Sequence, residues 1–199
     1  MTRNPTTLSR SYFEELYERD PDPWKFRSSA YERNKYRATL AALPCARYAS
    51  GLELGCSIGL LTKMPSVRCR RLTAVEGSQS AIGSARIACR GLENISFLRM
   101  MVPKRFPHGK FDLILLSEIL YFLAVDDVRL LARLCLSTLL PHGDMVLVHW
   151  LGETNYPLSG DDAAESFIAA AQKGAAVLWR SRQPMYRLDL LRKRPGAAA

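Results

Sequence analysis

The chain has 199 residues, of which 48% are hydrophobic and 24% charged, and its formal net charge is +9. These proportions are ordinary for a globular protein with a full core. The basic residues are scattered rather than gathered in a block or interleaved with aromatic residues, so they do not indicate a nucleic-acid-binding module. The sequence contains no apolar run long enough to cross a bilayer, and its first residues do not resemble a secretory signal.

The five cysteines are odd in number and widely spaced. Because no CxxC pair or Cys/His cluster occurs, the sequence predicts neither a disulfide framework nor a bound metal. We therefore expect a reducing, cytoplasmic location.

The N-terminal segment predicts two helices that precede a sheet. Ser11 and Glu14 have capping-box spacing at the start of the first helix, which must end at an Asp-Pro-Asp-Pro run. Ser29 and Glu32 form a second capping box, and the helix that they open must stop before Pro44.

The rest of the chain alternates between strand and helix patterns, which predicts an α/β sheet with right-handed crossovers. We expect one domain, with an N-terminal helical cap at 1–46 and an α/β core at 47–199. Strands are predicted at 51–54, 71–75, 94–100, 111–116, 145–149, 175–180 and 185–191, with helices at 78–89, 127–140 and 161–173. A further helix after Gly59 must be short, since Pro65 interrupts it.

A glycine turn follows the first strand and predicts a nucleotide-like ligand. Gly55 permits the sharp bend, and Gly59 allows close backbone approach. Glu53, just before the turn, can organise the loop and attract the positive end of a cofactor. Glu76 ends the second strand about 20 residues later, where a carboxylate can bind both ribose hydroxyls. Dinucleotide and S-adenosylmethionine sites share this geometry, but the turn lacks the third glycine of G-x-G-x-x-G, which favours S-adenosylmethionine.

Four predicted loops should meet at the carboxyl edge of the sheet, where open α/β sheets bind ligands. They are 55–59, 76–78, 100–103 and 117–121.

Motifs in the order expected of a known fold support this interpretation. The segments 53–59, 111–114 and 140–143 resemble motifs of class I S-adenosylmethionine-dependent methyltransferases, whose Rossmann-like fold has a mostly parallel seven-stranded sheet flanked by helices. The segments 12–17, 22–24, 31–36 and 117–121 are similar to the nodulation protein S (NodS) family. This resemblance implies a bacterial N-methyltransferase of Nod-factor synthesis. Its substrate would be a chitooligosaccharide whose non-reducing terminal glucosamine carries a free amine.

The resemblance also implies a set of cofactor-binding residues, with S-adenosyl-L-homocysteine as the product. Gly55, Cys56 and Gly59 would line the methionine and ribose portion, and Glu76 would hold the ribose. The remaining members are Trp24, Arg33, Glu53, Gly77, Met100, Met101 and Ser117.

Two of these residues could have another role, and the residues expected to contact adenine depart from the usual class I pattern. Arg33 or Lys35 could pair with the cofactor carboxylate, but Arg33 could equally lie on a solvated helix face. Trp24 could close over the cofactor or anchor the cap in the core. Residues 98–101 lack the acidic residue that often binds adenine in class I members, so adenine should be held by apolar packing and backbone contacts.

The predicted chemistry is methyl transfer to an amine, for which the protein mainly positions the amine and excludes water. Glu118 and His149, at the ends of strands four and five, are the candidates for accepting a proton, and Tyr121 for orienting the sugar. His149 could instead be a strand-end histidine with satisfied nitrogens. The loop 152–162 could be a lid or a plain connection.

The sequence is also compatible with other functions. The basic charge is compatible with an RNA or protein methyltransferase, although we expect no nucleic-acid partner and no membrane span. A non-catalytic S-adenosylmethionine-binding protein is a further alternative. A dehydrogenase is disfavoured by the glycine spacing.

Overall fold

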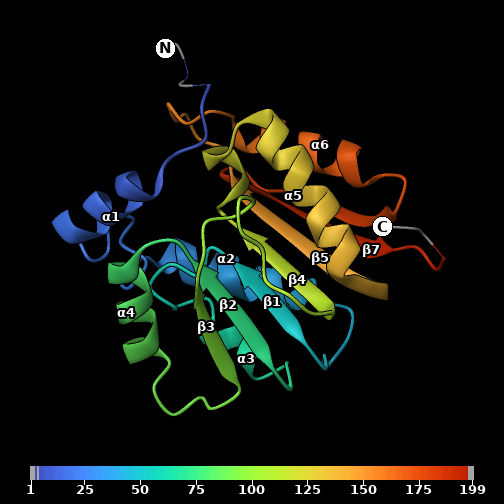
Figure 1. The fold of residues 1–199 in the computed structure, drawn as a ribbon, viewed down its shortest axis with the longest axis horizontal. Helices are drawn as coiled ribbons and strands as arrows, with labels where there is room; N and C mark the ends of the chain where they lie inside the picture. Colours follow the sequence, from blue (N-terminus) through green and yellow to red (C-terminus); the bar gives the residue numbers. More distant parts are fainter. Residues whose placement is uncertain (1–2, 4, 197–199) are drawn as a thin grey trace.

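The computed structural model describes residue 3 and residues 5–196, so residues 1, 2 and 4 of the predicted cap and 197–199 of the predicted core lie outside the described residues. The described chain forms a seven-stranded sheet with helices on both faces (Figure 1). The strands are β1 (Gly51–Leu54), β2 (Leu72–Glu76), β3 (Ile95–Arg99), β4 (Phe111–Ser117), β5 (Leu139–Trp150), β6 (Ala175–Arg182) and β7 (Tyr186–Lys193). All seven predicted strands are present.

The strand order places three strand ends together at one edge of the sheet. The order is β3-β2-β1-β4-β5-β7-β6, with β7 antiparallel to both β5 and β6. Because β1 lies between the parallel strands β2 and β4, the order reverses there, and open α/β sheets bind ligands at such switch points.

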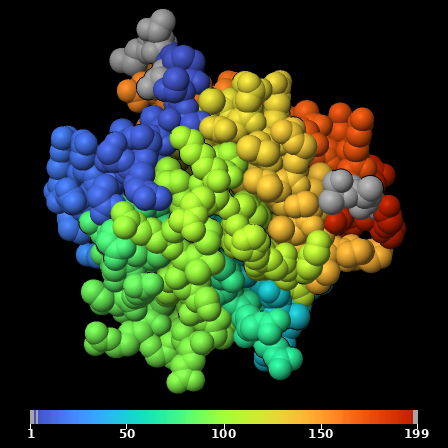
Figure 2. Space-filling model, in the orientation of Figure 1, coloured from blue at the N-terminus to red at the C-terminus, as the bar shows by residue number. Residues whose placement is uncertain are grey.

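The helices lie before and between the strands. They are α1 (Arg10–Arg19), α2 (Ala30–Ala41), α3 (Lys63–Ser66), α4 (Gln79–Ala88), α5 (Val125–Thr138) and α6 (Gly160–Ala171), with a 3-10 turn η1 at Leu120–Phe122. No helix among these described residues is long and apolar enough to span a membrane. Between β3 and β4 the described chain crosses as an extended loop, which covers the face beside α5 in Figure 2.

The central strand β4 is buried on both faces because its alternate side chains point to opposite layers. Ile114 and Leu116 belong to the cluster packed under α5 and α6. Leu113 and Leu115 belong to the cluster packed against the segment after α2. Figure 1 shows α5 and α6 on one face and α2 behind the sheet.

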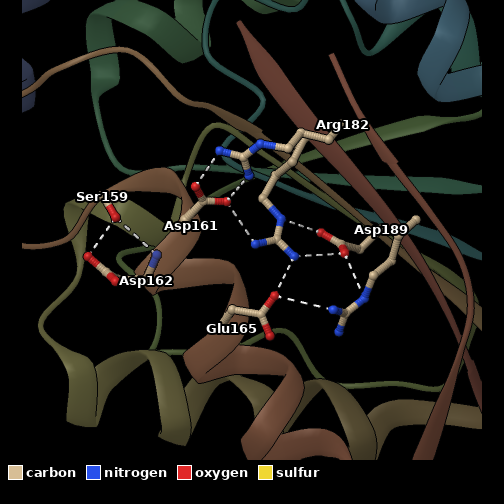
Figure 3. Close-up of polar contacts among 8 residues, drawn as sticks. Ser159, Asp161, Asp162, Glu165, Arg182 and Asp189 are labelled. Atoms are coloured by element: carbon tan, nitrogen blue, oxygen red, sulfur yellow. Dashed lines mark hydrogen bonds and ion pairs between the residues drawn. The ribbon is translucent and has the colours of Figure 1, made fainter. Parts of the chain in front are cut away.

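A network of ion pairs attaches α6 to the antiparallel strands (Figure 3). Arg182 of β6 donates to Asp161 at the start of α6 from both terminal guanidinium nitrogens, at 2.7 and 2.8 Å. Arg187 of β7 binds the buried Asp189 in the same two-bond manner and also donates to Glu165 at 2.8 Å. The acidic and basic side chains pair with one another, so the network connects α6 to β6 and β7.

The caps of the N-terminal helices differ in part from the prediction. Ser29 accepts a hydrogen bond from the Glu32 backbone, as predicted for a helix N-cap. Helix α1, however, is capped by Ser9 rather than Ser11. Ser and Thr near a helix start compete for the cap position, and spacing alone selected the wrong residue.

Candidate functional site

A cavity of about 450 Å³ opens at the carboxyl ends of β1, β2 and β4, under the N-terminal cap. Each of the four predicted loops contributes to its lining. The cap adds an aromatic wall that includes Phe13, Tyr17, Trp24, Phe26 and Tyr36. The volume is in the range of small-molecule sites in proteins.

The glycine turn is shaped by positive φ angles at Gly55 and Ser57, of 78° and 50°. The backbone nitrogens of Gly55 and Cys56 both donate to the carbonyl oxygen of Val75 at 2.9 Å, which joins the turn to β2. Gly59, by contrast, does not line the cavity. A Cβ atom there would come within 2.8 Å of the Ala85 Cα, so this glycine allows α4 to pack against the turn rather than allowing a ligand to approach.

Glu76 holds two of the lining loops in place. Its carboxylate accepts hydrogen bonds from the backbone nitrogens of Ser57, Gly77 and Ser78 at 2.7–2.9 Å. Burial raises the pKa of this carboxyl group, although the three N–H donors oppose the rise. A carboxylate offers about four acceptor positions, so Glu76 retains capacity for a ligand hydroxyl at the cavity wall.

Glu53 is a fully buried carboxyl group in the cavity lining, 1% exposed. Among the described residues, the Thr62 hydroxyl lies beside this carboxyl group, but neither carboxyl oxygen makes a hydrogen bond of full geometry. Burial raises the pKa of Glu53 to about 7, and the Thr62 hydroxyl opposes the rise. A buried carboxylate without a partner is costly, and such an arrangement is typical of a position that a ligand completes.

The cap is tied directly to this half of the cavity. The Tyr17 hydroxyl lies 2.6 Å from Ser57 Oγ, and Trp24 packs edge-on against the Tyr17 ring. Glu14 accepts hydrogen bonds from the backbone nitrogens of Gln79 and Ser80 at the start of α4. Trp24 therefore lines the cavity and anchors the cap, and its closure over a cofactor stays a prediction.

The other half of the cavity is organised around Glu118, which has a positive φ of 56° after β4. One carboxylate oxygen accepts a hydrogen bond from Lys35 Nζ. The other accepts from the Tyr121 hydroxyl and from the Trp150 backbone nitrogen, both at 2.8 Å. Lys35 also donates to Glu32 at 2.9 Å, so the buried lysine forms one ion pair within α2 and a second with Glu118 after β4.

Besides Gly59, two predicted residues do not line the cavity. His149 is buried, and its Nε2 accepts a hydrogen bond from the Leu120 backbone at 3.2 Å. Burial lowers the pKa of His149 to about 4, so the ring is neutral near pH 7. Arg33 donates to the Ser28 carbonyl on an exposed helix face. Arg33 thus lies on a solvated helix face, and Lys35 is the cation of α2 that lines the cavity. His149 matches its alternative only in part, because its Nδ1 is buried with no hydrogen-bond partner among the described residues.

The lining is negatively charged although the whole chain is basic. Among the described residues that line the cavity, the charged ones are four glutamates and one lysine: Glu32, Glu53, Glu76, Glu118 and Lys35. A site of this sign repels phosphate groups and favours cationic or zwitterionic ligands. The cavity is therefore poorly suited to a dinucleotide pyrophosphate.

Comparison with known proteins gives the family of the chain. A family model described as Nodulation protein S (NodS) matches residues 10–150. The chain belongs to the NodS family. Nodulation protein S of Bradyrhizobium diazoefficiens is 32% identical over 127 residues, which represent 63% of this chain and 61% of that protein. The alignment thus spans about six tenths of the length of this curated NodS relative.

Solved structures show the same fold. The crystal structure described as N-methyltransferase NodS from Bradyrhizobium japonicum in complex with S-adenosyl-L-homocysteine aligns with a TM-score of 0.79 and 23% identity, over 92% of this chain and 97% of that one. A putative methyltransferase from Pseudomonas syringae aligns with a TM-score of 0.72 and 30% identity, over 83% and 100%. The predicted class I methyltransferase fold is confirmed.

The NodS-family match includes the cap, which carries site residues that sequence reasoning missed. From the sequence, Glu32 was interpreted only as part of a capping box, and Tyr17 and Tyr36 only as parts of the motifs 12–17 and 31–36. The signal was present in α2, because residues three apart share a helix face and Glu32 precedes Lys35 by three. The predicted residues Met100 and Met101 also line the cavity, and Met101 packs against Gly77.

Proposed function

We propose that this NodS-family chain is an S-adenosylmethionine-dependent N-methyltransferase. Its acceptor is the free amine of the deacetylated non-reducing-end glucosamine of a chitooligosaccharide, as in Nod-factor biosynthesis. The observation that carries the proposal is the excess of carboxylates in the cavity of a basic protein. A methyl sulfonium and a sugar ammonium are both cations, and both complement such a site.

The residues present suit the cofactor. The unpartnered carboxyl of Glu53 would face its positively charged methionine portion, and Glu76 would bind the ribose hydroxyls. Met100, Met101 and Val102 offer an apolar wall for adenine in place of an acidic residue. When bound, S-adenosylmethionine supplies an electrophilic methyl group on a sulfonium.

The chain itself contributes positioning, desolvation and charge. Tyr121 is held by Glu118 and stacks on Tyr156 with the ring centroids 5.5 Å apart. Trp150 contacts Tyr31 edge-on at 5.6 Å. These rings line the half of the cavity next to Glu118, and aromatic faces with polar tips suit a sugar ring. Holding the amine there in line with the methyl group would account for most of the rate.

The descriptions of the relatives support the substrate class. One is described as Nodulation protein S and a structural neighbour as an N-methyltransferase bound to S-adenosyl-L-homocysteine. The oligosaccharide is therefore the part of the proposal that most needs a direct assay. The wild-type chain would be incubated with methyl-labelled cofactor and chitooligosaccharides of graded length, each deacetylated at the terminal residue or fully acetylated.

Label in the deacetylated sugars alone is expected. Label in neither set, with S-adenosyl-L-homocysteine bound in calorimetry, would contradict the proposed acceptor and favour a non-catalytic binding protein. Calorimetric titration with NAD serves as the control for the cofactor, because the negative cavity should not bind it.

The net charge of +9 favours a second candidate, an RNA methyltransferase. Its binding to tRNA would weaken steeply with salt. The negative lining of the cavity opposes an RNA acceptor, and absence of tRNA binding at low salt would remove this candidate.

A further inference from the structure

Glu32 is a carboxylate of the cavity wall that has spare hydrogen-bonding capacity. The residue is 8% exposed, and its side chain projects from the first turn of α2. Its Oε1 accepts from Lys35 Nζ at 2.9 Å. Its Oε2 is buried and has no hydrogen-bond partner among the described residues, although the Tyr36 hydroxyl lies nearby.

Glu118, the candidate chosen from sequence, is already engaged on both oxygens. One accepts from Lys35, and the other accepts from a tyrosine hydroxyl and a backbone amide. Its Oε2 already accepts two hydrogen bonds, and its Oε1 is paired with the Lys35 ammonium, so a substrate ammonium would have to share Oε1 with a like charge. Glu118 is therefore suited to orienting Lys35 and Tyr121, while the Oε2 of Glu32 has only the Tyr36 hydroxyl nearby.

We propose that Glu32 binds the ammonium of the acceptor through Oε2 and accepts its proton before methyl transfer. This inference rests on the proposed function and assigns the acceptor-binding carboxylate of that same site. Glu32 would be a catalytic residue, because it would touch the reacting nitrogen, whereas Glu118 would be a positioning residue.

The proposed step balances in charge and atoms. The ammonium gives one proton to the Glu32 carboxylate and becomes a neutral amine with a free electron pair. That pair forms the N–C bond to the methyl group as the C–S bond breaks, and sulfur keeps the bonding pair as a neutral thioether. The positive charge passes to the methylated nitrogen, and the proton on Glu32 returns to solvent when the product leaves.

The surroundings of Glu32 make it a stronger base than an exposed glutamate. Burial raises its pKa, Lys35 and the Tyr36 hydroxyl oppose the rise, and the negative Glu118 adds to it. The remaining titratable groups that face this region are the hydroxyls of Tyr31, Tyr36 and Tyr121 and the carboxyl group of Glu53. Burial raises the pKa of each tyrosine, so these hydroxyls stay neutral and do not compete for the proton near pH 7.

The test compares Glu32→Gln with the wild type and with Glu93→Gln, a surface control on the loop before β3. Glutamine keeps the shape of the side chain but cannot accept the proton. We expect kcat/KM for the deacetylated oligosaccharide to fall by about 100-fold near pH 7, which is typical of a lost general base. The loss should shrink in alkaline buffer, where the amine arrives unprotonated. Affinity for S-adenosyl-L-homocysteine should change by less than about twofold, and Glu93→Gln should match the wild type.

A second measurement separates this inference from the proposed function. Calorimetry with S-adenosyl-L-homocysteine present compares the binding of deacetylated and fully acetylated oligosaccharide. If the wild type binds the deacetylated oligosaccharide but transfers no methyl group, the proposed function is contradicted, but the binding role of Glu32 is not. Glu32→Gln with kcat/KM and amine affinity within about threefold of wild type would overturn the role of Glu32. A loss of kcat/KM of equal size at every pH would also overturn it. A thermal melt with S-adenosyl-L-homocysteine shows that the variant is folded.

Discussion

The pKa of Glu53 makes a quantitative prediction about stability. Burial raises the pKa of this carboxyl group from 4.5 to about 7 in the folded chain. Because the unfolded chain releases the proton at lower pH, rising pH favours unfolding across that interval and no further above it. At about 1.4 kcal/mol for each pH unit, the free energy of unfolding should fall by about 3 kcal/mol in total.

Replacing Glu53 with glutamine should remove this dependence, because the amide does not titrate. Urea unfolding of the cofactor-free wild type and of Glu53→Gln would be measured at about pH 5 and about pH 8. Between these values the wild type should lose about 2–3 kcal/mol more than the variant. Comparing the two losses cancels the contribution of the other titrating groups.

The absolute stability of Glu53→Gln is a poorer test, because a buried amide without partners carries its own cost. The difference in pH dependence does not contain that cost. Equal losses in the two chains, within about 0.5 kcal/mol, would refute the account of Glu53 as a buried carboxyl without a partner.

Three further substitutions test the site. Gly59→Ala should destabilise the chain by about 2 kcal/mol more than Gly91→Ala in urea unfolding, since both glycines have positive φ but only Gly59 meets a neighbour, Ala85; equal costs would contradict the packing role. Glu76→Ala should weaken S-adenosyl-L-homocysteine binding by about 10- to 100-fold in calorimetry while the chain stays folded, and unchanged affinity would remove the ribose assignment. Burial lowers the pKa of His149 from 6.5 to about 4. As the pH falls from about 6.5 to about 4, the free energy of unfolding should therefore drop by about 3 kcal/mol more in the wild type than in His149→Gln. An equal drop in both chains would mean that the histidine is not buried and neutral.

The sequence was sufficient to predict the sheet, and the reason is local. β4 reads as a continuous apolar run because it is buried on both faces, and the glycine turn marks the end of β1. Ser29 was identified as a cap because a short polar side chain before a helix has few other roles. Each of these signals lies within one segment of the chain.

The contacts that decide the chemistry join distant segments and could not be predicted in the same way. Lys35 and Glu118 are 83 positions apart, and Tyr17 and Ser57 are 40 apart. Sequence reasoning placed Glu118 correctly at the carboxyl edge of the sheet, but not the partners that occupy its oxygens. His149 lies at the predicted strand end, yet its side chain turns to the Leu120 backbone rather than into the cavity.

The central claim is that this cavity brings a cationic methyl donor and a sugar amine together. Mass spectrometry of a reaction with S-adenosylmethionine and an oligosaccharide carrying one terminal free amine tests it most directly. The account predicts a methyl group on that terminal nitrogen, and none on the fully acetylated sugar. A methyl group on an oxygen, or on both sugars equally, would contradict it.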